Sequence, residues 1–403
     1  MYIKIYRLQV RYCSGFRSTS KLLFLSCVCI WSLVCCHLYL STCYYCNQER
    51  DQDETNWPLV IEHKGRWSPD RIYQSNKIPD LGIFLNSDMF LSQGKRLLWI
   101  KQRISRLSED WERAFEDVKH KPYIQIDPMS VLVFPGLLSE YSPYNFAENA
   151  FKGGYLGELI QWSDLLAGLH ILGHRVRIIT QREYVLSLKN TTDEFDLVFT
   201  DYTGLKALES IEMFLQYKCK TRVLDVYGTE PRYNFRTADY NTLERYANWN
   251  LEDTKQFWTF YPDTPDNTFL GFVVPQSNTI PTRTVTNRNI AVVYGKLADS
   301  LYNQRHNVPL LQMVSEFFEV HSTFREGYTH LPDNIINHGF LKSNDFAMLL
   351  GRAKLFIGLG YPYDGPGPFE ALAEGAIFLQ HKFSPSRNRD NDKFFSVSEE
   401  YSH

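Results

Sequence analysis

The sequence has no strong excess of charge of either sign. Its 43 lysines and arginines nearly balance its 46 aspartates and glutamates, which gives a formal net charge of −3. Binding to nucleic acid needs a clustered basic surface, so a nucleic-acid partner is not expected. The apolar share of 44% and the charged share of 22% are typical of one to three globular domains and exclude a disordered or fibrous chain.

Charged residues are also missing from residues 22–46, which contain no Asp, Glu, Lys or Arg. An apolar span of about 20 residues can cross a lipid bilayer as a helix. Residues 1–21 contain basic residues and no acidic ones, and acidic residues follow the span. Because positive residues stay cytosolic, we expect a cytosolic tail over 1–21, a transmembrane signal anchor over 22–46 and a luminal remainder, which is the topology of a single-pass type II membrane protein.

A cleaved signal peptide is the alternative interpretation of this segment. Its apolar region would be shorter, and cleavage needs an Ala-x-Ala-like site, whereas Leu38–Cys46 contains neither Ala nor Gly. The sequence therefore favours the anchor. The sequon Asn190-Thr191-Thr192 agrees with a luminal address and makes Asn190 the candidate glycosylation site.

Cysteine is scarce beyond the predicted anchor, where Cys219 is the only one in the sequence. A lone cysteine is unusual in an oxidising compartment. Cys219 is therefore either buried, or its disulfide partner is missing from this chain. Cys43 and Cys46 have CxxC spacing but no second ligand pair. A zinc site is therefore not expected there.

Motifs for metal or nucleoside triphosphate binding are lacking as well. Asp51-Gln52-Asp53 borders the predicted anchor and Asp390-Asn391-Asp392 lies near the chain end, so no Asp-x-Asp follows a predicted strand. His170 and His174 are four residues apart, but no acid stands between them as in a zinc motif. No P-loop Lys-Ser/Thr pair is present. We expect a metal-independent reaction without a cofactor, with helix dipoles and a basic residue offsetting the leaving-group charge.

From residue 129 onward, short apolar runs alternate with helical patterns. The first part predicts strands at Val131–Phe134, Val176–Thr180, Leu197–Thr200 and Val223–Val226, and a helix at Glu158–Leu172. The second part predicts strands at Ile290–Tyr294, Leu355–Gly358 and Ala376–Leu379, and helices at Pro309–Val320, Ser343–Ala353 and Pro368–Glu374. This alternation predicts two doubly wound α/β domains, 129–280 and 281–403, with a hinge near 275–288. Residues 47–128 are expected to form a luminal stem, with helical spacing in Lys95–Glu116.

Glu158 is the candidate catalytic residue of the first domain. It follows a Gly-rich segment, 153–157, and opens the predicted helix. A carboxylate at that position can act as a general base on an acceptor hydroxyl. Alternatively, Glu158 complements the positive end of the helix dipole. Asp164, further along the same helix, is expected to be structural.

The loop from Gly358 to Glu370 is the candidate ligand site of the second domain. Its glycines, among them Gly358, Gly360 and Gly365, let the backbone approach a pyrophosphate. Glu370 is expected in the first turn of the following helix, where its carboxylate can accept hydrogen bonds from both hydroxyls of a ribose. A role in complementing the helix dipole is the alternative.

Several strings of this sequence are similar, in the same order, to one family. They are Phe151–Asp164, Arg222–Asp225, Gly228–Pro231, Pro265–Val274, Val293–Lys296 and Gly358–Glu370. From about residue 130 to about residue 395, the chain resembles the α-1,6-mannosylglycoprotein 6-β-N-acetylglucosaminyltransferases, also called N-acetylglucosaminyltransferase V.

The resemblance implies a two-domain GT-B-type fold whose domains face each other across a cleft, in a Golgi membrane protein. It implies a hexosyltransferase that moves N-acetylglucosamine from UDP-GlcNAc to the 6-hydroxyl of the α1,6-arm mannose of N-glycans. The anomeric centre inverts and no metal takes part. The catalytic base falls on Glu158, and the donor-site carboxylates fall on Asp364 and Glu370.

The sequence departs from the family pattern at several places. Asp364 stands where the family has Glu, and Ser398 stands where the family has a lysine after the pair Phe394-Phe395. The family continues past the position of His403, and its stem contains many cysteines. These departures imply an incomplete nucleotide-sugar-binding domain. The alternative function is therefore a non-catalytic, membrane-anchored glycan-binding relative.

Overall fold

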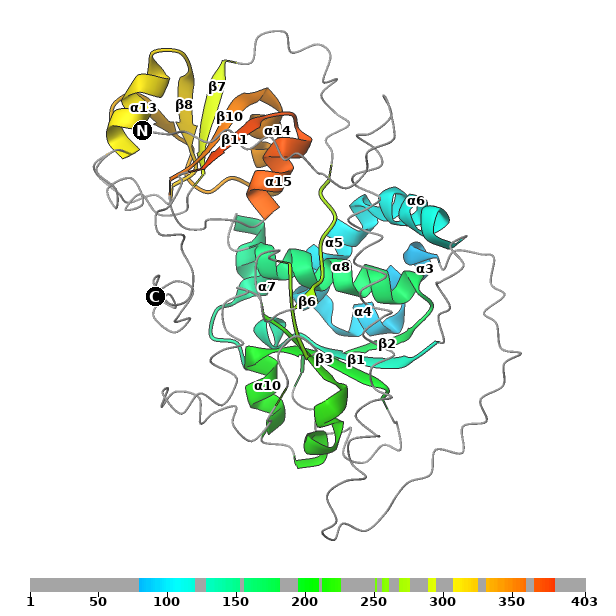
Figure 1. Ribbon diagram of the computed structural model, residues 1–403. Coiled ribbons are helices and arrows are strands. Elements are labelled where there is room, and N and C mark those ends of the chain that lie inside the picture. The colour runs from blue at the N-terminus through cyan, green and yellow to red at the C-terminus, as the bar shows by residue number, and fades with distance from the viewer. Residues whose placement is uncertain are drawn as a thin grey trace, which may run out of the picture. The chain divides into compact units, whose positions relative to one another are not determined.

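The computed structural model describes part of the chain (Figure 1). The described residues are 80–119, 128–152, 156–181, 195–209, 212–225, 251, 256–260, 268–275, 289–294, 307–324, 331–359 and 366–380. The predicted tail and anchor, the sequon at Asn190, the loop residues Gly360, Asp364 and Gly365, and most of the predicted hinge lie outside them. No helix within the described ranges is long and apolar enough to cross a membrane.

The first sheet is fully parallel. Its strands are β1 (Ser130–Phe134), β2 (Arg175–Ile178), β3 (Leu197–Asp201), β4 (Thr221–Leu224), β5 (Phe257–Thr259) and β6 (Thr268–Phe269). Their order is β2-β1-β3-β4-β5-β6, with every neighbouring pair parallel. From β1 the chain passes to β2, which lies on one side of β1. It then passes to β3, which lies on the other side of β1. The strand order therefore reverses between β1 and β3, the kind of position where doubly wound sheets bind ligands.

Helices cover both faces of this sheet (Figure 1). The connection from β1 to β2 contains η3 (Gly136–Leu138), α7 (Phe146–Asn149), η4 (Ala150–Lys152) and the long helix α8 (Gly157–Ile171). The opposite face carries α10 (Tyr202–Glu209) and η6 (Glu212–Lys220). Alternate strand residues such as Leu132 and Val198 pack with Leu205 of α10 in one core, because successive side chains of a strand point to opposite faces.

Part of the predicted stem is folded onto this domain. It forms α3 (Leu81–Leu85), α4 (Asp88–Ser92), η2 (Gly94–Leu97), α5 (Leu98–Arg106) and α6 (Ser108–Lys119). The apolar positions that give this segment its helical spacing are all buried, namely Leu97, Ile100, Ile104, Leu107 and Trp111.

Polar contacts fasten this segment to the edge strand β2. Gln93 Oε1 accepts hydrogen bonds from the backbone N–H of Thr180, at 2.9 Å, and from its hydroxyl, at 2.7 Å. Arg96 donates to the carbonyl of Thr180 at 2.8 Å. Since Thr180 is the second residue after β2, the helical segment is bound to the carboxyl end of a strand.

The second sheet is also fully parallel. Its strands are β7 (Ile290–Tyr294), β8 (Glu319–Ser322), β9 (Ile335–Asn337), β10 (Ala353–Gly358) and β11 (Ile377–Gln380), in the order β11-β10-β7-β8-β9. The helix α13 (Asn307–Ser315) packs in the core on one face. The helices α14 (Ser343–Arg352) and α15 (Pro366–Ala373) pack in the core on the other. Here the strand order reverses between β7 and β10.

The described chain divides into two compact units. One contains residues 80–145 and 160–272, and the other contains residues 146–159 and 273–380. The first unit holds the first sheet with its helical segment 81–119, and the second holds the second sheet. The boundary passes through α8, whose first turn belongs to the second unit.

The prediction of parallel α/β sheets is confirmed, and every predicted strand is present. The helix predicted at Pro309–Val320 is wrong at its end, because α13 stops at Ser315 and Val320 lies in the strand β8. The apolar residues at 317, 318 and 320 continue the helical pattern, and periodicity cannot separate a helix from a short strand in such a run.

Candidate active site

Glu158 lies in the first turn of α8, where the sequence predicts it. Its side chain is largely enclosed, since the residue is 5% exposed. The helix α8 belongs to the connection that follows β1 in the first sheet. Connections that follow parallel strands begin at the carboxyl edge of the sheet. A carboxylate at this place can accept a proton from a bound hydroxyl.

The residues one turn after Glu158 bind α8 to the sheet. The side chain of Gln161 donates a 3.3 Å hydrogen bond to the carbonyl of Trp258 in β5. Trp162 is fully buried. The indole N–H of Trp162 interacts with the carboxyl group of Asp201 at the end of β3, and this interaction lowers the pKa of Asp201. The geometry between the two groups is not that of a regular hydrogen bond. The sheet thus fixes the inner face of α8.

Asp201 is a buried carboxyl group that the sequence did not single out. Its Oδ2 accepts the backbone N–H of Leu137 at 3.0 Å, and its Oδ1 accepts the N–H of Gly204 at 2.9 Å. Burial raises the pKa of Asp201 to about 6, and these hydrogen bonds oppose the shift. Asp201 therefore joins the connections that follow β1 and β3, the two strands at the reversal of strand order. A polar residue directly after the apolar run Leu197–Thr200 was the available signal.

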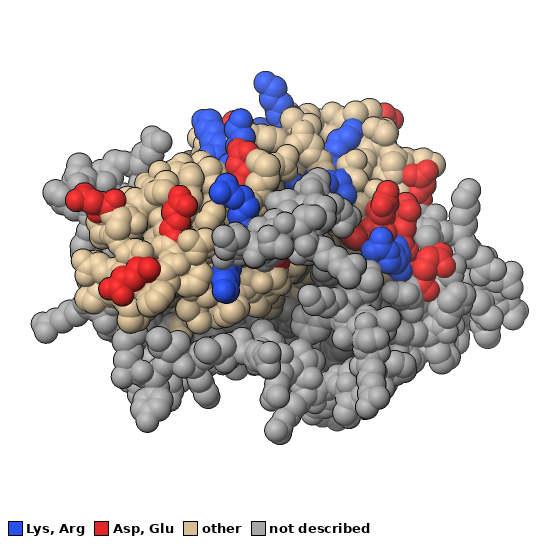
Figure 2. Space-filling view, turned by 90° about the horizontal axis from the view of Figure 1, so that it is seen from above, with Lys and Arg blue, Asp and Glu red and all other residues tan. Residues whose placement is uncertain are grey.

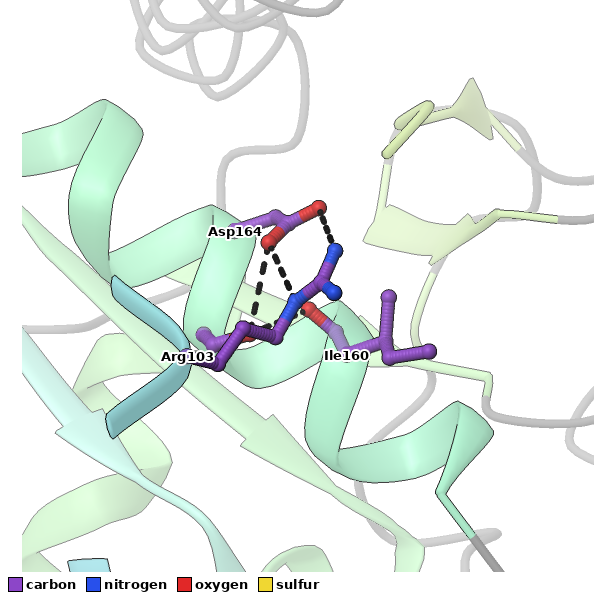
Figure 3. A network of polar contacts seen from close by, with 4 residues as sticks. Arg103, Ile160 and Asp164 are labelled. Carbon is purple, nitrogen blue, oxygen red and sulfur yellow. Dashed lines mark hydrogen bonds and ion pairs between the residues drawn. The ribbon is translucent and has the colours of Figure 1, made fainter. Parts of the chain in front are cut away.

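Asp164 forms a buried ion pair with Arg103 of α5 (Figure 3). Arg103 Nε and Nη2 each lie 3.1 Å from a carboxylate oxygen of Asp164. The side chains are 2% and 4% exposed, respectively. The structural role predicted for Asp164 is confirmed, and its partner comes from the segment predicted to be a stem.

Gly358 ends β10 and lies between Tyr294 of β7 and Gln380 of β11 in the register of the sheet. A β-carbon at Gly358 would collide with the carboxamide of Gln380. Both polar atoms of that carboxamide are enclosed, and neither has a hydrogen-bond partner among the residues that the structure describes. Packing by Gln380 is therefore one physical reason for glycine at position 358, besides the approach of a ligand. Gly367, at the start of α15, similarly leaves room for the ring of Tyr294.

Glu370 does not occupy the first turn of α15, which corrects the sequence prediction. The helix begins at Pro366 and has no acidic residue in its first turn, so Glu370 falls in the second turn. The helix-dipole effect falls off within the first turn. This weakens the dipole interpretation of Glu370, whose half-buried side chain remains a candidate for ligand binding.

The remaining polar candidates have structural partners. His170 stacks on Phe84 at 4.2 Å, and His174 Nδ1 accepts the backbone N–H of Met129 at 3.2 Å. Among the described residues, no group of three or more His, Cys, Asp or Glu side chains could hold a metal ion. Cys219 is half-buried and forms no disulfide within the described part of the chain.

Two parallel α/β sheets, each with a glycine-containing connection at its reversal of strand order, define a class of proteins that bind ligands at the carboxyl ends of strands. The protein-family model for glycosyltransferase family 18 matches residues 38–399 of the sequence. The chain belongs to glycosyltransferase family 18, which confirms the resemblance seen in the sequence.

Named relatives agree with this family. The chain is 37% identical over 332 residues to "Alpha-1,6-mannosylglycoprotein 6-beta-N-acetylglucosaminyltransferase B" of Homo sapiens, covering 76% of this chain and 41% of the relative. It is 36% identical over 319 residues to the A protein of Homo sapiens, with coverage of 74% and 42%. The Caenorhabditis elegans "Alpha-1,6-mannosylglycoprotein 6-beta-N-acetylglucosaminyltransferase" is 32% identical over 337 residues, with coverage of 74% and 49%. The chain thus spans less than half the length of these relatives.

A solved structure, "Spinosyn Forosaminyltransferase SpnP", has 14% sequence identity and a TM-score of 0.34, covering 63% of this chain and 80% of that one.

Proposed function

We propose that this chain is an inverting N-acetylglucosaminyltransferase that uses UDP-GlcNAc and adds a β-1,6 branch to the α1,6-arm mannose of N-glycans. The observation that carries the proposal is its 36–37% identity, over about three quarters of the chain, to two human proteins named as 6-β-N-acetylglucosaminyltransferases. The proposed partners are UDP-GlcNAc, the N-glycan of a glycoprotein and, through residues 22–46, a lipid bilayer.

In the proposed reaction, the 6-hydroxyl of mannose attacks C1 of N-acetylglucosamine. The new O6–C1 bond forms as the bond from C1 to the β-phosphate oxygen breaks on the opposite face, so the configuration at C1 inverts. The hydroxyl proton passes to the carboxylate of Glu158, and UDP leaves with the electron pair. The fixed position of Glu158 at the start of an enclosed helix supports its role as the base.

The donor is proposed to bind at the carboxyl edge of the second sheet. Gly358 and Glu370, with Gly360, Asp364 and Gly365 of the same loop, would contact UDP-GlcNAc. The reversal of strand order between β7 and β10 supports this placement, because Gly358 ends β10 at that point. Glu370 would accept the ribose hydroxyls. The reaction is proposed to need no metal, with helix dipoles and a basic residue offsetting the charge of UDP.

The proposed location is the Golgi membrane, in the orientation of a single-pass type II protein with the catalytic part in the lumen. The charge-free residues 22–46 and the basic residues that precede them support this topology.

The face shown in Figure 2 carries Lys and Arg among Asp and Glu side chains over its described part. That mixture is typical of a solvated protein surface.

The test is to incubate the full 403-residue chain with UDP-GlcNAc and a biantennary N-glycan acceptor. Transfer would release UDP and give a product whose mass increases by one N-acetylglucosamine, with a β-1,6 linkage to the α1,6-arm mannose. Acceptor binding without UDP release would reject the enzyme and support a glycan-binding protein. A product with another linkage would reject the proposed acceptor position.

A further inference from the structure

The ion pair between Arg103 and Asp164 joins two enclosed side chains, one from α5 and one from α8 (Figure 3). Two hydrogen bonds of 3.1 Å align the guanidinium of Arg103 with the carboxylate of Asp164. Such a two-point contact fixes the relative orientation of both groups. Enclosed ion pairs can often be replaced by apolar residues without loss of stability. What the charged pair adds is a defined geometry between α5 and α8.

This geometry is transmitted within α8 toward its first turn. The hydroxyl of Ser163 donates to the carbonyl of Ile160 at 2.9 Å and lies 3.3 Å from Oδ1 of Asp164. The single hydroxyl hydrogen of Ser163 can serve only one of these two acceptors at a time. The carboxylate held by Arg103 is therefore linked to the turn that follows Glu158 through the backbone of α8. On the sheet side, Gln161 holds the same turn through the carbonyl of Trp258. Contacts from two directions thus fix the rotation of α8 about its axis.

We propose that Arg103 is a positioning residue for Glu158, acting through Asp164 and the rigid helix α8. This inference rests on the proposed function, in which Glu158 is the base. Asp164 lies six positions after Glu158, about 9 Å along an α-helix at 1.5 Å per residue. A small rotation of the helix would move the carboxylate away from the acceptor hydroxyl. A misplacement of about 1 Å at a reacting group can cost roughly a hundredfold in rate.

Three variants separate positioning from simple stabilisation. Arg103→Lys keeps the charge but removes the two-point contact. Arg103→Met leaves the carboxylate of Asp164 without its partner. The double variant Arg103→Met/Asp164→Leu replaces the ion pair by apolar side chains. The control is Val198→Ala, which opens a cavity in the fully buried core of the same sheet without touching α5 or α8 polar contacts.

The first measurement is the steady-state kinetics of the full chain together with its melting temperature. We expect kcat to fall at least tenfold in Arg103→Lys, with an unchanged KM for UDP-GlcNAc. The double variant should regain the melting temperature lost in Arg103→Met but not the lost kcat. Parental kcat in the double variant would overturn the proposal. The proposal would also be overturned if Val198→Ala lost as much kcat as Arg103→Lys while having the same melting temperature as that variant.

The second measurement does not depend on transfer. The carboxyl carbon of Glu158 is followed by carbon-13 NMR in a pH titration, with its signal identified by its loss in Glu158→Gln. We expect its titration to change in Arg103→Lys and in the double variant, but not in Val198→Ala. An unchanged titration in both variants would overturn the positioning role. If the parent chain releases no UDP yet the titration moves, the proposed function fails while the coupling between Arg103 and Glu158 stands.

Discussion

The carboxylate of Asp201 and the backbone N–H of Gly204 form a 2.9 Å hydrogen bond where β3 passes into α10. Burial raises the pKa of this carboxyl from its ordinary value of 3.8 to about 6. The folded protein therefore holds the proton more tightly than the unfolded chain does. The resulting stabilisation is present below about pH 4 and is lost as the pH rises through about 6, by an amount on the order of 3 kcal/mol.

The variant Asp201→Asn should lack this pH dependence. We expect the melting temperature of the parent, relative to that of Asp201→Asn, to fall as the pH rises from 4 to 7. Asp333→Asn, an exposed substitution in the other unit, serves as the control. A relative melting temperature that rises with pH would show that the N–H groups of Leu137 and Gly204 outweigh the effect of burial.

Gly358→Ala should destabilise the second sheet because its methyl group would overlap the carboxamide of Gln380. Overpacking of a well-packed site costs about 1–3 kcal/mol. The double variant Gly358→Ala/Gln380→Ala removes the colliding group, so we expect most of this loss to be recovered. Chemical denaturation of the parent, both single variants and the double variant gives the coupling energy. Additive single effects would show that Gln380 is not the reason for glycine at position 358.

Glu158→Gln should reduce turnover by about 10²–10⁴-fold, the usual effect of losing a general base. Glutamine keeps the size of the side chain but cannot accept the proton, so we expect near-normal binding of UDP. If Glu158 only complemented the helix dipole, the loss would be about 0.3–1 kcal/mol of stability with little change in turnover. Glu148→Gln, an exposed substitution in α7, is the matched control. More than about a tenth of parental turnover in folded Glu158→Gln would exclude the base assignment.

Glu370→Ala should weaken the binding of UDP by about 1.5–3 kcal/mol, the range for a hydrogen bond to a charged group. The physical reason is the loss of the carboxylate proposed to accept the ribose hydroxyls. Calorimetric titration with UDP measures the effect, and Glu316→Ala, an exposed substitution in the same unit, is the control. Unchanged affinity in a folded Glu370→Ala protein would remove Glu370 from the proposed donor site.

The proposed topology predicts that protease added to sealed microsomes spares residues 60–403. Digestion should become complete once detergent opens the vesicles. A glycosidase should reduce the apparent mass of the parent but not that of Asn190→Gln, because Asn190 carries the sequon. Cleavage of the main part of the chain in intact vesicles would contradict a luminal location.

Seven of the eleven described strands could be predicted because they are continuous apolar runs, whereas β5, β6, β8 and β9 were missed. Ile290–Tyr294, for example, is predicted and found with the same limits. Short strands were missed where they lack this signal: β6 has two residues, and β9 has two exposed residues among its three. The start of α15 was misplaced because Pro366 and Gly367 are typical loop residues, although proline is favoured in the first turn of a helix.

The sequence by itself determined the family, the parallel α/β architecture and the position of Glu158 at the start of a helix. These features are recorded locally, in apolar periodicity, glycine spacing and motif order. Only the tertiary structure decided that α5 belongs to the first domain, that Arg103 pairs with Asp164, and that Asp201 joins the connections after β1 and β3. Each of these contacts links residues more than 60 positions apart, so its existence depends on how the elements pack. The sequence predicted a structural role for Asp164 but no partner for it. The two charges become a fixed pair because packing removes both from water.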